Sequence, residues 1–411
     1  MEIRKPISIE EAIGRVIQEA KVGLTETVPL LEAEGRFLAE DLIADHPIPF
    51  IDRSGYDGYA LRAIDTEKAS TDNPVCLQVI DSIGAGEVSS KQVKEREAIR
   101  IMTGAQMPEG ADAVVMLEDV QAVEREGQTY IYVDKPLFKG ENIHLRGEDT
   151  AEGTVLARSG RQIKAGEMAM LATFGYAQVK VYKQPVVGIF TTGTELLPVE
   201  ASLEPGKIRN SNAYMLVSQV KRAGGIPRYL GILPDDLELC FQSVKEALQE
   251  VDFLITTGGA AVGDFDFVQP IIQRLGAKLL FNKLAMRPGS VTTIAKLDEK
   301  WLFGLSGNPA ACFVGLELFV RPVLRTYLGE KNPHLQRSKA RLEEDITKTN
   351  NFTRLMRAKL ELREDRVIAR PIGLDKSNIV SSLIEANGLL IVPPKTKLAK
   401  GDLVDVIWFD R

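Results

Sequence analysis

The feature that most restricts the fold of this chain is an alternation of apolar strands and amphipathic helices between residues 185 and 330. Strand-like runs end in glycine in PVVGIFTTG, DFLITTGG and KWLFGLSG, and helical patterns occur at 211–224 and 235–250. Strands that alternate with helices are typical of a parallel sheet with helices on both faces. We therefore predict a three-layer α/β domain over residues 185–330.

The segments on both sides of this domain are rich in short strands. VCLQVI, AIRIM, AVVML and TYIYV lie between residues 46 and 140, separated by turns, and predict a β-rich domain. The tail from 331 to 411 alternates polar and apolar residues over strand-length runs, which predicts a small barrel or sandwich. Near the start, Ser8 and Glu11 form a capping box that predicts a helix.

Composition narrows the function. The 411 residues carry a net charge of −6, whereas a general nucleic-acid binder is more often basic, so we expect no nucleic-acid partner. The three cysteines and three histidines are scattered, which argues against a disulfide framework and against a thiolate or histidine metal site. Since no signal core and no apolar run of about 18 residues occur, we expect a cytoplasmic protein without a membrane partner.

Three glycine-rich loops follow strands of the α/β domain. They are TTGTE at 191–195, TTGGAAVGDFD at 256–266 and LSGNPAA at 305–311. Ligands of open α/β sheets bind beyond the carboxyl ends of the strands, and glycine lets backbone N–H groups approach them closely. We expect these loops to form a ligand site.

The third loop has the features of a phosphate-binding turn. After Ser306 and Gly307, Asn308 can cap a helix whose first turn starts at Pro309. The free N–H groups of such a turn attract phosphate or a similar oxyanion. An ordinary, well-capped strand–turn–helix explains the same residues equally well.

The second loop carries acids rather than a P-loop lysine. Gly258 to Gly263 has the glycine spacing of a P-loop, but Asp264 stands where the lysine would be, so this is no Walker A motif. Asp264 and Asp266, with the acidic pair that starts at Asp235, could hold Mg²⁺ between protein and phosphate. For the pair at Asp235 alone, a helix N-cap is the favoured alternative.

Two cations precede a Pro-Gly turn further along. Lys283 and Arg287 lie in KLAMRPGS, and both side chains suit an anionic ligand. A solvated turn is the alternative. The acids near these cations favour a metal–phosphate site.

The β-rich domain offers weaker candidates. Asp57 lies in SGYDGYALRA, Thr103 follows a strand in IRIMTGAQ, and Asp149 lies in RGEDT. Each taken alone is better explained as structural, because a carboxylate in a glycine turn often bonds its own backbone. A nucleophilic triad is disfavoured, since GxSxG is absent and histidines are few.

Taken together, these motifs resemble the MoeA family, the molybdopterin molybdenumtransferases related to the gephyrin E-domain. The resemblance covers essentially the whole chain. It rests on an ordered set of motifs: DRSGYDGYALRA, GAGE, IRIMTGAQMPEGADAVVMLE, RGEDT, FTTGTELL, LPDD, TTGGAAVGDFDFV, LAMRPGS and LSGNP.

The resemblance implies an elongated homodimer of four-domain subunits, with the active cleft between two subunits. Residues 1–45 and 141–184 would form a linking and dimerisation domain, and 46–140 the β-rich domain. Residues 185–330 would form a molybdopterin-binding α/β domain like MogA and MoaB, and 331–411 a C-terminal β-barrel.

The resemblance also implies a reaction, in which molybdenum from molybdate is inserted into adenylylated molybdopterin and AMP is released, with Mg²⁺ as the required cation. A molybdopterin adenylyltransferase and molybdoenzyme apoproteins are the implied partners. By motif position, Asp57, Thr103 and Glu195 would be catalytic, and Asp149, Asp264 and Asp266 would hold the metal. The implied binding residues are Asp235, Gly258, Gly259, Gly263, Lys283, Arg287, Ser290, Ser306, Gly307, Asn308 and Pro309.

Some positions depart from the family pattern. Thr194 replaces an aspartate, Ala261 lacks a hydroxyl, Ser290 replaces a cation, and Ser306 replaces a proline. These changes leave open the alternative that the chain is a non-catalytic relative that binds molybdopterin or acts as a scaffold. A general nucleotide phosphohydrolase is disfavoured without a P-loop or a base histidine. Because Asp57 and the other acids are retained, we expect an active enzyme.

Overall fold

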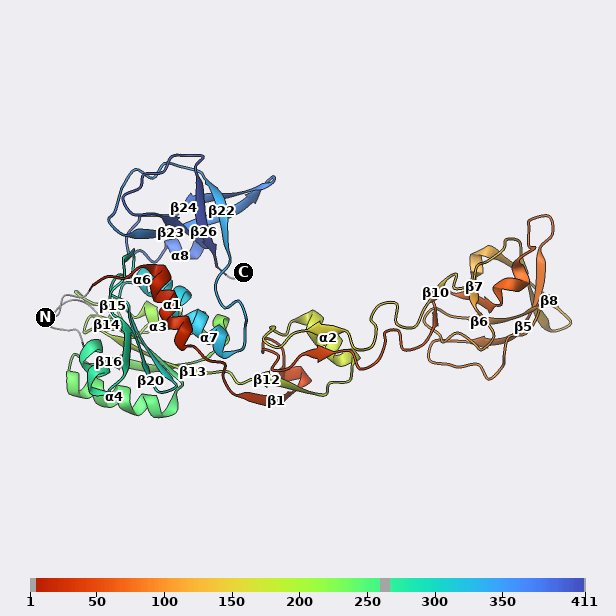
Figure 1. The fold of residues 1–411 in the computed structure, drawn as a ribbon, viewed down its shortest axis with the longest axis horizontal. Coiled ribbons are helices and arrows are strands. Elements are labelled where there is room, and N and C mark those ends of the chain that lie inside the picture. Colours follow the sequence, from red (N-terminus) through yellow and green to blue (C-terminus); the bar gives the residue numbers. More distant parts are fainter. Residues whose placement is uncertain (1–4, 259–266, 410–411) are drawn as a thin grey trace. The chain divides into compact units, whose positions relative to one another are not determined.

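The computed structural model describes residues 5–258 and 267–409 of the chain. It separates into two compact units, and Figure 1 shows their elements. The large unit comprises residues 1–40, 159–168 and 177–411, and the β-rich unit comprises residues 41–158 and 169–176. This division is coarser than four domains, so the predicted domain boundaries stay predictions.

A six-stranded sheet lies at the centre of the α/β part of the large unit. In spatial order its strands are β16 (Ile226–Leu233), β13 (Val186–Thr192), β17 (Phe253–Thr257), β21 (Lys300–Leu305), β20 (Thr293–Leu297) and β18 (Lys278–Phe281). The first four strands run parallel, as predicted. The prediction of a wholly parallel sheet is wrong at the β20–β18 edge, which is antiparallel. Only residues 298–299 join β20 to β21, and so short a turn connects antiparallel strands.

Helices cover both faces of this sheet, which makes the predicted three layers. One face carries α1 (Ile9–Glu19), α3 (Ser211–Ala223), α6 (Pro309–Gly315), the π-helical turn η4 (Leu316–Val320) and α7 (Arg321–Tyr327). The other carries α4 (Leu237–Glu250) and α5 (Val268–Arg274). Neighbouring residues of β13 point to opposite faces, so Ile189 packs in the first core and Phe190 in the second.

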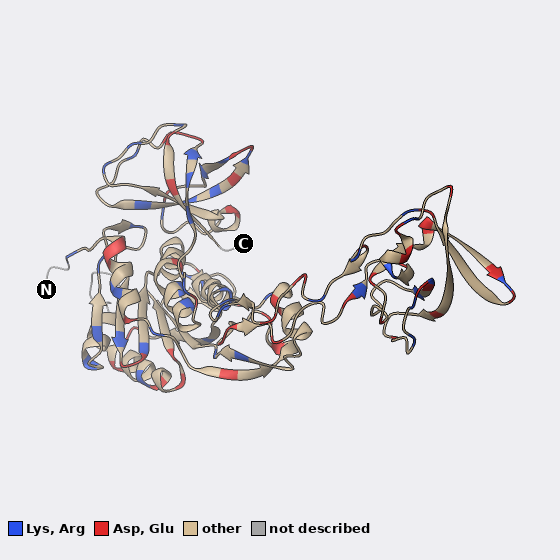
Figure 2. Cartoon of the chain, turned by 45° about the vertical axis from the view of Figure 1, so that its right-hand side comes forward, with Lys and Arg blue, Asp and Glu red and all other residues tan. Residues whose placement is uncertain are grey.

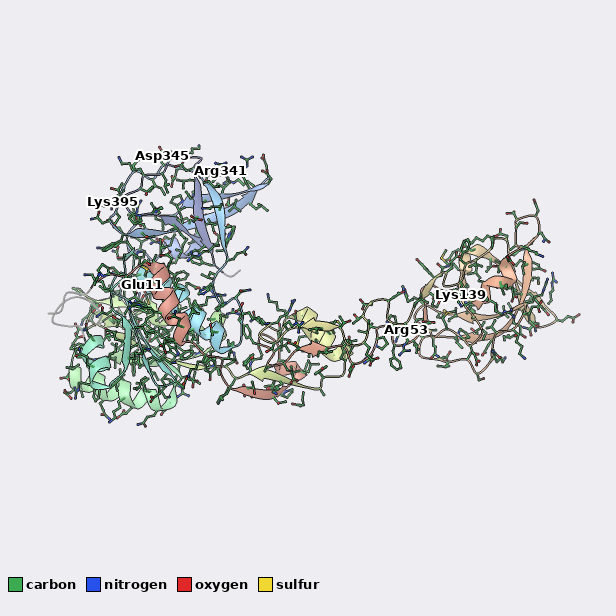
Figure 3. All side chains as sticks on the ribbon, in the orientation of Figure 1. Glu11, Arg53, Lys139, Arg341, Asp345 and Lys395 are labelled. Carbon is green, nitrogen blue, oxygen red and sulfur yellow. The ribbon has the colours of Figure 1, made fainter. Side chains whose placement is uncertain are left out.

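Local signals in the sequence set the ends of these helices. The Ser8 hydroxyl accepts a hydrogen bond from the Glu11 N–H at 3.1 Å, as the capping box predicted for α1 (Glu11 is labelled in Figure 3). Helix α3 ends at Gly224, whose φ of +97° is left-handed and disfavours other residues. Helix α1 therefore starts, and helix α3 ends, where the sequence indicated.

The C-terminal part of the large unit is a closed five-stranded barrel, which decides between the predicted barrel and sandwich. Its strands close in the order β23 (Thr353–Arg363), β24 (Arg366–Pro371), β22 (Arg337–Leu342), β26 (Leu403–Trp408), β25 (Gly388–Val392) and back to β23. A short helix, α8 (Ser382–Glu385), packs beside it. Strand β19 (Met286–Arg287) of the α/β part pairs in parallel with β23, so the barrel is hydrogen-bonded to the α/β part.

Smaller pairings complete the large unit. Strand β1 (Thr25–Pro29) runs antiparallel to β12 (Gln178–Tyr182), and a 3-10 turn, η1 (Leu30–Glu32), follows β1. Strands β14 (Leu196–Leu197) and β15 (Ile208–Arg209) form a short parallel pair after β13.

The β-rich unit is built on a second six-stranded sheet. In spatial order its strands are β7 (Ala113–Met116), β4 (Gly58–Leu61), β6 (Glu97–Ile101), β5 (Val75–Ile83), β9 (Gln128–Val133) and β8 (Val120–Arg125). Two short pairs join β3 (Arg53–Ser54) to β10 (Ile143–His144) and β2 (Leu42–Ile43) to β11 (Val155–Ala157). The unit also contains the 3-10 turns η2 (Ala63–Thr66) and η3 (Leu117–Asp119) and most of α2 (Ala165–Thr173).

Charged side chains of both signs are interspersed along the strands and helices of each unit (Figure 2). Among residues 5–258 and 267–409, the structure contains no helix with the length and apolar character needed to span a membrane.

Candidate functional site

The loops after β13, β17 and β21 meet at the carboxyl edge of the parallel strands. The Gly258 N–H donates to the Leu305 carbonyl at 3.1 Å, and the Thr192 hydroxyl donates to the Thr257 carbonyl at 3.0 Å. The described ends of the three glycine-rich loops are therefore side by side, as expected for the ligand edge of an open α/β sheet.

Close packing of these loops explains one of their glycines. Gly258 has a φ of +82°, and a Cβ there would lie 2.5 Å from the Thr192 hydroxyl oxygen. The side chain of Asn212, on α3, donates to the Gly307 carbonyl at 2.7 Å and holds the third loop. Helix α3 and the neighbouring loops thus fix the backbone at this edge of the sheet. They leave no room for a residue larger than glycine at Gly258.

The turn before α6 differs in one detail from the sequence prediction. The helix begins at Pro309, as predicted, but the Asn308 side chain makes no capping hydrogen bond. The Asn308 N–H instead donates to the Ser306 hydroxyl at 3.3 Å, and the Ala310 N–H donates to the Ser377 carbonyl at 3.0 Å. A loop of the barrel therefore supplies the acceptor for a first-turn N–H group. Asn308 occupies the predicted N-cap position, but the capping hydrogen bond expected from its side chain is absent.

A polar pocket of about 530 Å³ opens beside this turn. The α/β part contributes the predicted residues Arg287, Ser290, Ser306 and Asn308. The barrel contributes a second set that the sequence analysis missed: Lys348, Asn350, Arg354, Arg357, Asp375, Lys376, Ser377 and Asn378. The lining holds five basic side chains and one carboxylate, in a chain whose net charge is −6. This charge excess suits an anion.

Arg357 organises the barrel side of the pocket. Its side chain is 2% exposed, its Nε donates to the Ser382 hydroxyl at 2.8 Å, and its Nη2 donates to the carbonyls of Leu374 and Lys376 at 2.9 and 3.1 Å. Burial lowers the pKa of the Arg357 guanidinium, and the charge of Asp375 opposes that shift. Arg357 therefore fixes the loop from Leu374 to Lys376 through its Nη2 and bonds Ser382 through its Nε.

The other predicted residues of the large unit are spread over neighbouring loops. Glu195 and Asp235 are exposed, and Lys283 is half-buried and outside the pocket lining. Asp236 is the N-cap of α4, where its carboxylate accepts the Leu239 N–H at 2.9 Å. The N-cap interpretation of the acidic pair is therefore right for Asp236. The predicted site residues Gly259, Gly263, Asp264 and Asp266 lie outside the described residues, as does Ala261.

In the β-rich unit, Asp57 and Thr103 form a direct contact. One Asp57 carboxylate oxygen accepts the Thr103 N–H and the Thr103 hydroxyl, each at 2.7 Å. The backbone bond first and the hydroxyl bond second lower the pKa of Asp57 below its ordinary value. Asp57 therefore stays ionised near neutral pH and suits cation binding or orientation better than proton donation.

Asp149 is also in the β-rich unit. Its side chain is exposed, and its N–H donates to the Ile48 carbonyl at 3.0 Å. Within the described part of the chain, no three His, Cys, Asp or Glu side chains are grouped so that they could hold a metal ion. Of the carboxylates predicted to bind the metal, only Asp149 is described.

Comparisons with known proteins agree with the motifs. Residues 7–175 match the MoeA N-terminal region (domain I and II), 188–326 match a probable molybdopterin binding domain, and 339–409 match the MoeA C-terminal region (domain IV). These models together span most of the chain.

Full-length relatives and a solved structure are also similar. The chain is 53% identical to the molybdopterin molybdenumtransferase of Bacillus subtilis (strain 168), over 97% of this chain and 92% of that protein. It is 47% identical to the protein of the same name from Staphylococcus aureus (strain MSSA476), over 99% and 96%. The crystal structure of the molybdopterin biosynthesis moeA protein from Pyrococcus horikoshii OT3 matches with a TM-score of 0.83 and 34% identity, over 98% of this chain and all of that one. The resemblance read from the motifs is confirmed, and the chain belongs to the MoeA family.

Proposed function

We propose that this chain is a molybdenumtransferase that inserts molybdenum from molybdate into adenylylated molybdopterin and releases AMP. The relatives' shared name supports the reaction class, over nearly the full length of both chains. The observation that carries the proposal is the pocket between the α/β part and the barrel, where five basic side chains and one carboxylate meet. Molybdate and the phosphates of the second substrate are all oxyanions, which such a lining favours.

Residues of the pocket have distinct tasks in this proposal. Arg287 is exposed, lines the pocket, and has its guanidinium carbon 5.9 Å from the centre of the Phe352 ring. Ser306 is 8% exposed and presents a hydroxyl from the turn before α6. Cationic and hydroxyl groups of this kind would bind the oxyanions and offset the charge that builds on the departing AMP.

The carboxylates would act outside this cationic lining. Asp57 is held ionised by two hydrogen bonds from Thr103 and would orient a cation or an attacking group. Mg²⁺ would be bound by Asp264 and Asp266 together with phosphate oxygens, because hard cations prefer oxygen ligands. Bound there, it would neutralise charge on the phosphates.

Membership of the family also supports proposals about the oligomeric state, the cellular location and the partners of this chain. We infer a homodimer that works in the cytoplasm, receives its substrate from a molybdopterin adenylyltransferase and passes its product to molybdoenzyme apoproteins. A scaffolding relative without turnover is the second candidate, because Ala261 and Ser290 depart from the family pattern.

One assay tests the reaction. Purified protein is given adenylylated molybdopterin and Mg²⁺, with molybdate or with sulfate as the matched control. We expect AMP release and reconstitution of a cofactor-free molybdoenzyme, both only with molybdate. If the protein binds adenylylated molybdopterin but forms neither product, the insertase proposal fails and the scaffold candidate replaces it.

A further inference from the structure

The contact between Asp57 and Thr103 joins two separate loops of the β-rich unit. Thr103 lies 46 residues beyond Asp57, in the turn after β6, and both of its bonds to Asp57 are 2.7 Å long. Both residues are exposed. Exposed side chains keep a fixed geometry when the backbone beneath each of them is held in place. The residues that hold these two loops therefore decide where the Asp57 carboxylate points.

The backbone of Ser54 holds the loop that carries Thr103. Ser54 ends β3, directly after Arg53, which is labelled in Figure 3. Its N–H donates to the Ala105 carbonyl at 2.9 Å, and its carbonyl accepts the Gly104 N–H at 2.8 Å. These are the two residues that follow Thr103 in the chain. The position of the Thr103 loop is therefore set against Ser54.

The hydroxyl of Ser54 holds the turn that carries Asp57. It donates to the Tyr56 carbonyl at 2.6 Å and accepts the Tyr56 N–H at 3.4 Å. The Tyr56 carbonyl belongs to the planar peptide group that joins Tyr56 to Asp57, so the hydroxyl bond orients the backbone from which Asp57 projects. Ser54 is 0% exposed, so its hydroxyl is shielded from solvent. One buried residue thus bonds both loops.

Other bonds hold the Asp57 turn without reaching the Thr103 loop. The Gly55 N–H donates to the Asn142 carbonyl at 2.8 Å, and the Leu117 N–H donates to the Asp57 carbonyl at 3.1 Å. Both partners belong to other parts of the β-rich unit. These bonds anchor the turn to the unit, whereas the bonds of Ser54 set the turn and the Thr103 loop relative to each other.

We propose that Ser54 is a positioning residue, which holds Asp57 and Thr103 in their mutual geometry through its hydroxyl on one side and its backbone on the other. This inference rests on the proposed function, in which Asp57 orients a cation or an attacking group, and adds to it the residue that sets the direction of the Asp57 carboxylate. A small displacement of such a group lowers the rate of a reaction even when the substrates still bind.

The test compares two substitutions in the full chain. Ser54→Ala removes the hydroxyl and keeps the backbone bonds. Thr66→Val is the matched control, because Thr66 is also 0% exposed in the same unit. Its hydroxyl likewise donates to a backbone carbonyl, that of Ala63 at 2.8 Å, and accepts a backbone N–H, that of Leu137 at 2.9 Å. Thermal unfolding of both variants measures how much stability each hydroxyl supplies.

Two readouts report on position rather than on stability. The first is deuterium exchange of the Thr103 amide, resolved to single residues by mass spectrometry, because the Thr103 N–H is bonded to Asp57. The second is steady-state kinetics with adenylylated molybdopterin, molybdate and Mg²⁺, which separates kcat from KM.

We expect Ser54→Ala to speed exchange of the Thr103 amide by about 2- to 10-fold and to lower kcat by a similar factor, the range for one lost hydrogen bond. The KM values of both substrates should stay unchanged, because Ser54 acts through Asp57 and touches neither substrate. Thr66→Val should lower the unfolding temperature but change neither readout. Equal changes in both variants would overturn the proposal, since a general loss of stability would then explain them.

Further outcomes separate this inference from the proposed function. If the parent protein turns over and a folded Ser54→Ala keeps the parent's kcat or the parent's Thr103 exchange rate, the assignment of Ser54 is wrong and the proposed function stands. If the parent never releases AMP, the proposed function fails, and faster Thr103 exchange in Ser54→Ala alone still supports the positioning of Asp57 by Ser54. Should Ser54→Ala not fold, Ser54→Cys replaces the hydroxyl by a weakly donating thiol, and parent values in that variant would reject the proposal.

Discussion

Replacing Gly258 by alanine should destabilise the α/β part far more than the same change at a comparable glycine. At a φ of +82°, an alanine adopts a left-handed conformation that costs about 1–2 kcal/mol. Its Cβ would also lie 2.5 Å from the Thr192 hydroxyl oxygen and 2.8 Å from the Thr192 carbonyl oxygen. Because one of these atoms is backbone, overpacking should add about 1–3 kcal/mol. We therefore expect a total loss of about 2–5 kcal/mol.

Gly206 is the matched control for this substitution. It lies in the same α/β part with a φ of +76°, and no heavy atom is within 4 Å of a Cβ built on it. Gly206→Ala should therefore lose only about 1–2 kcal/mol, from the backbone conformation alone. The difference between the two variants isolates the contact with Thr192.

Urea unfolding followed by tryptophan fluorescence measures this difference. Trp301, in β21, is 3% exposed and reports on the sheet beside Gly258. A Trp408→Phe background leaves Trp301 as the only tryptophan, because the chain has two. The free energies of unfolding are compared between variants whose slopes m against urea concentration are equal, because an equal m indicates that unfolding exposes the same surface. If Gly258→Ala loses no more free energy than Gly206→Ala, the packing argument for this loop is wrong.

Three further predictions concern single side chains. Thr103→Val removes the hydroxyl but keeps the backbone bond to Asp57, so the lowered pKa of Asp57 should rise part of the way to its ordinary value, and the acid limb of the pH–rate profile should move to higher pH. Because the pKa of Asp57 is lowered in the folded state, the ionised carboxylate stabilises the fold above the unfolded pKa, and this stabilisation is lost as pH falls through the folded pKa. Acid unfolding of Thr103→Val should therefore begin at higher pH than that of the parent protein. An unchanged acid-unfolding curve would contradict this. Asp236→Ala should lose about 1 kcal/mol of unfolding free energy through the missing cap of α4, whereas Asp235→Ala should lose much less. Burial raises the pKa of Cys312, so iodoacetamide should label it only after denaturation, and rapid labelling of the native protein would show that this core opens.

Periodicity predicted the α/β part well, because its signals are local. The capping residues of α1, the glycine after α3 and the apolar runs of the strands each act within a few residues of chain. The antiparallel edge was missed because the direction of β20 depends on a two-residue turn at 298–299, which the strand pattern alone does not reveal. Strand direction is a property of the connection rather than of the strand.

The candidate site was only half predictable from the sequence. Loop residues such as Arg287 and Ser306 were found because glycine-rich loops after parallel strands have a known place in the fold. The barrel's residues were missed because arginines in an alternating strand are normally assigned to its solvent face. Arg354 and Arg357 are three residues apart in β23, an odd spacing that puts them on opposite faces, so at least one of them had to point inward or be covered. That spacing was the available signal.

The barrel is hydrogen-bonded to the α/β part at two places beside the pocket. Strand β19 pairs with β23, and the Ala310 N–H at the start of α6 donates to the Ser377 carbonyl of the barrel. The same two connections carry Arg287 and Ser377 into the pocket. A substitution that loosens the barrel should therefore alter oxyanion binding before it unfolds the sheet, because the cations on the two sides are held at a fixed separation only while both connections persist. The glycine loops position the ligand edge, and the barrel completes its charge.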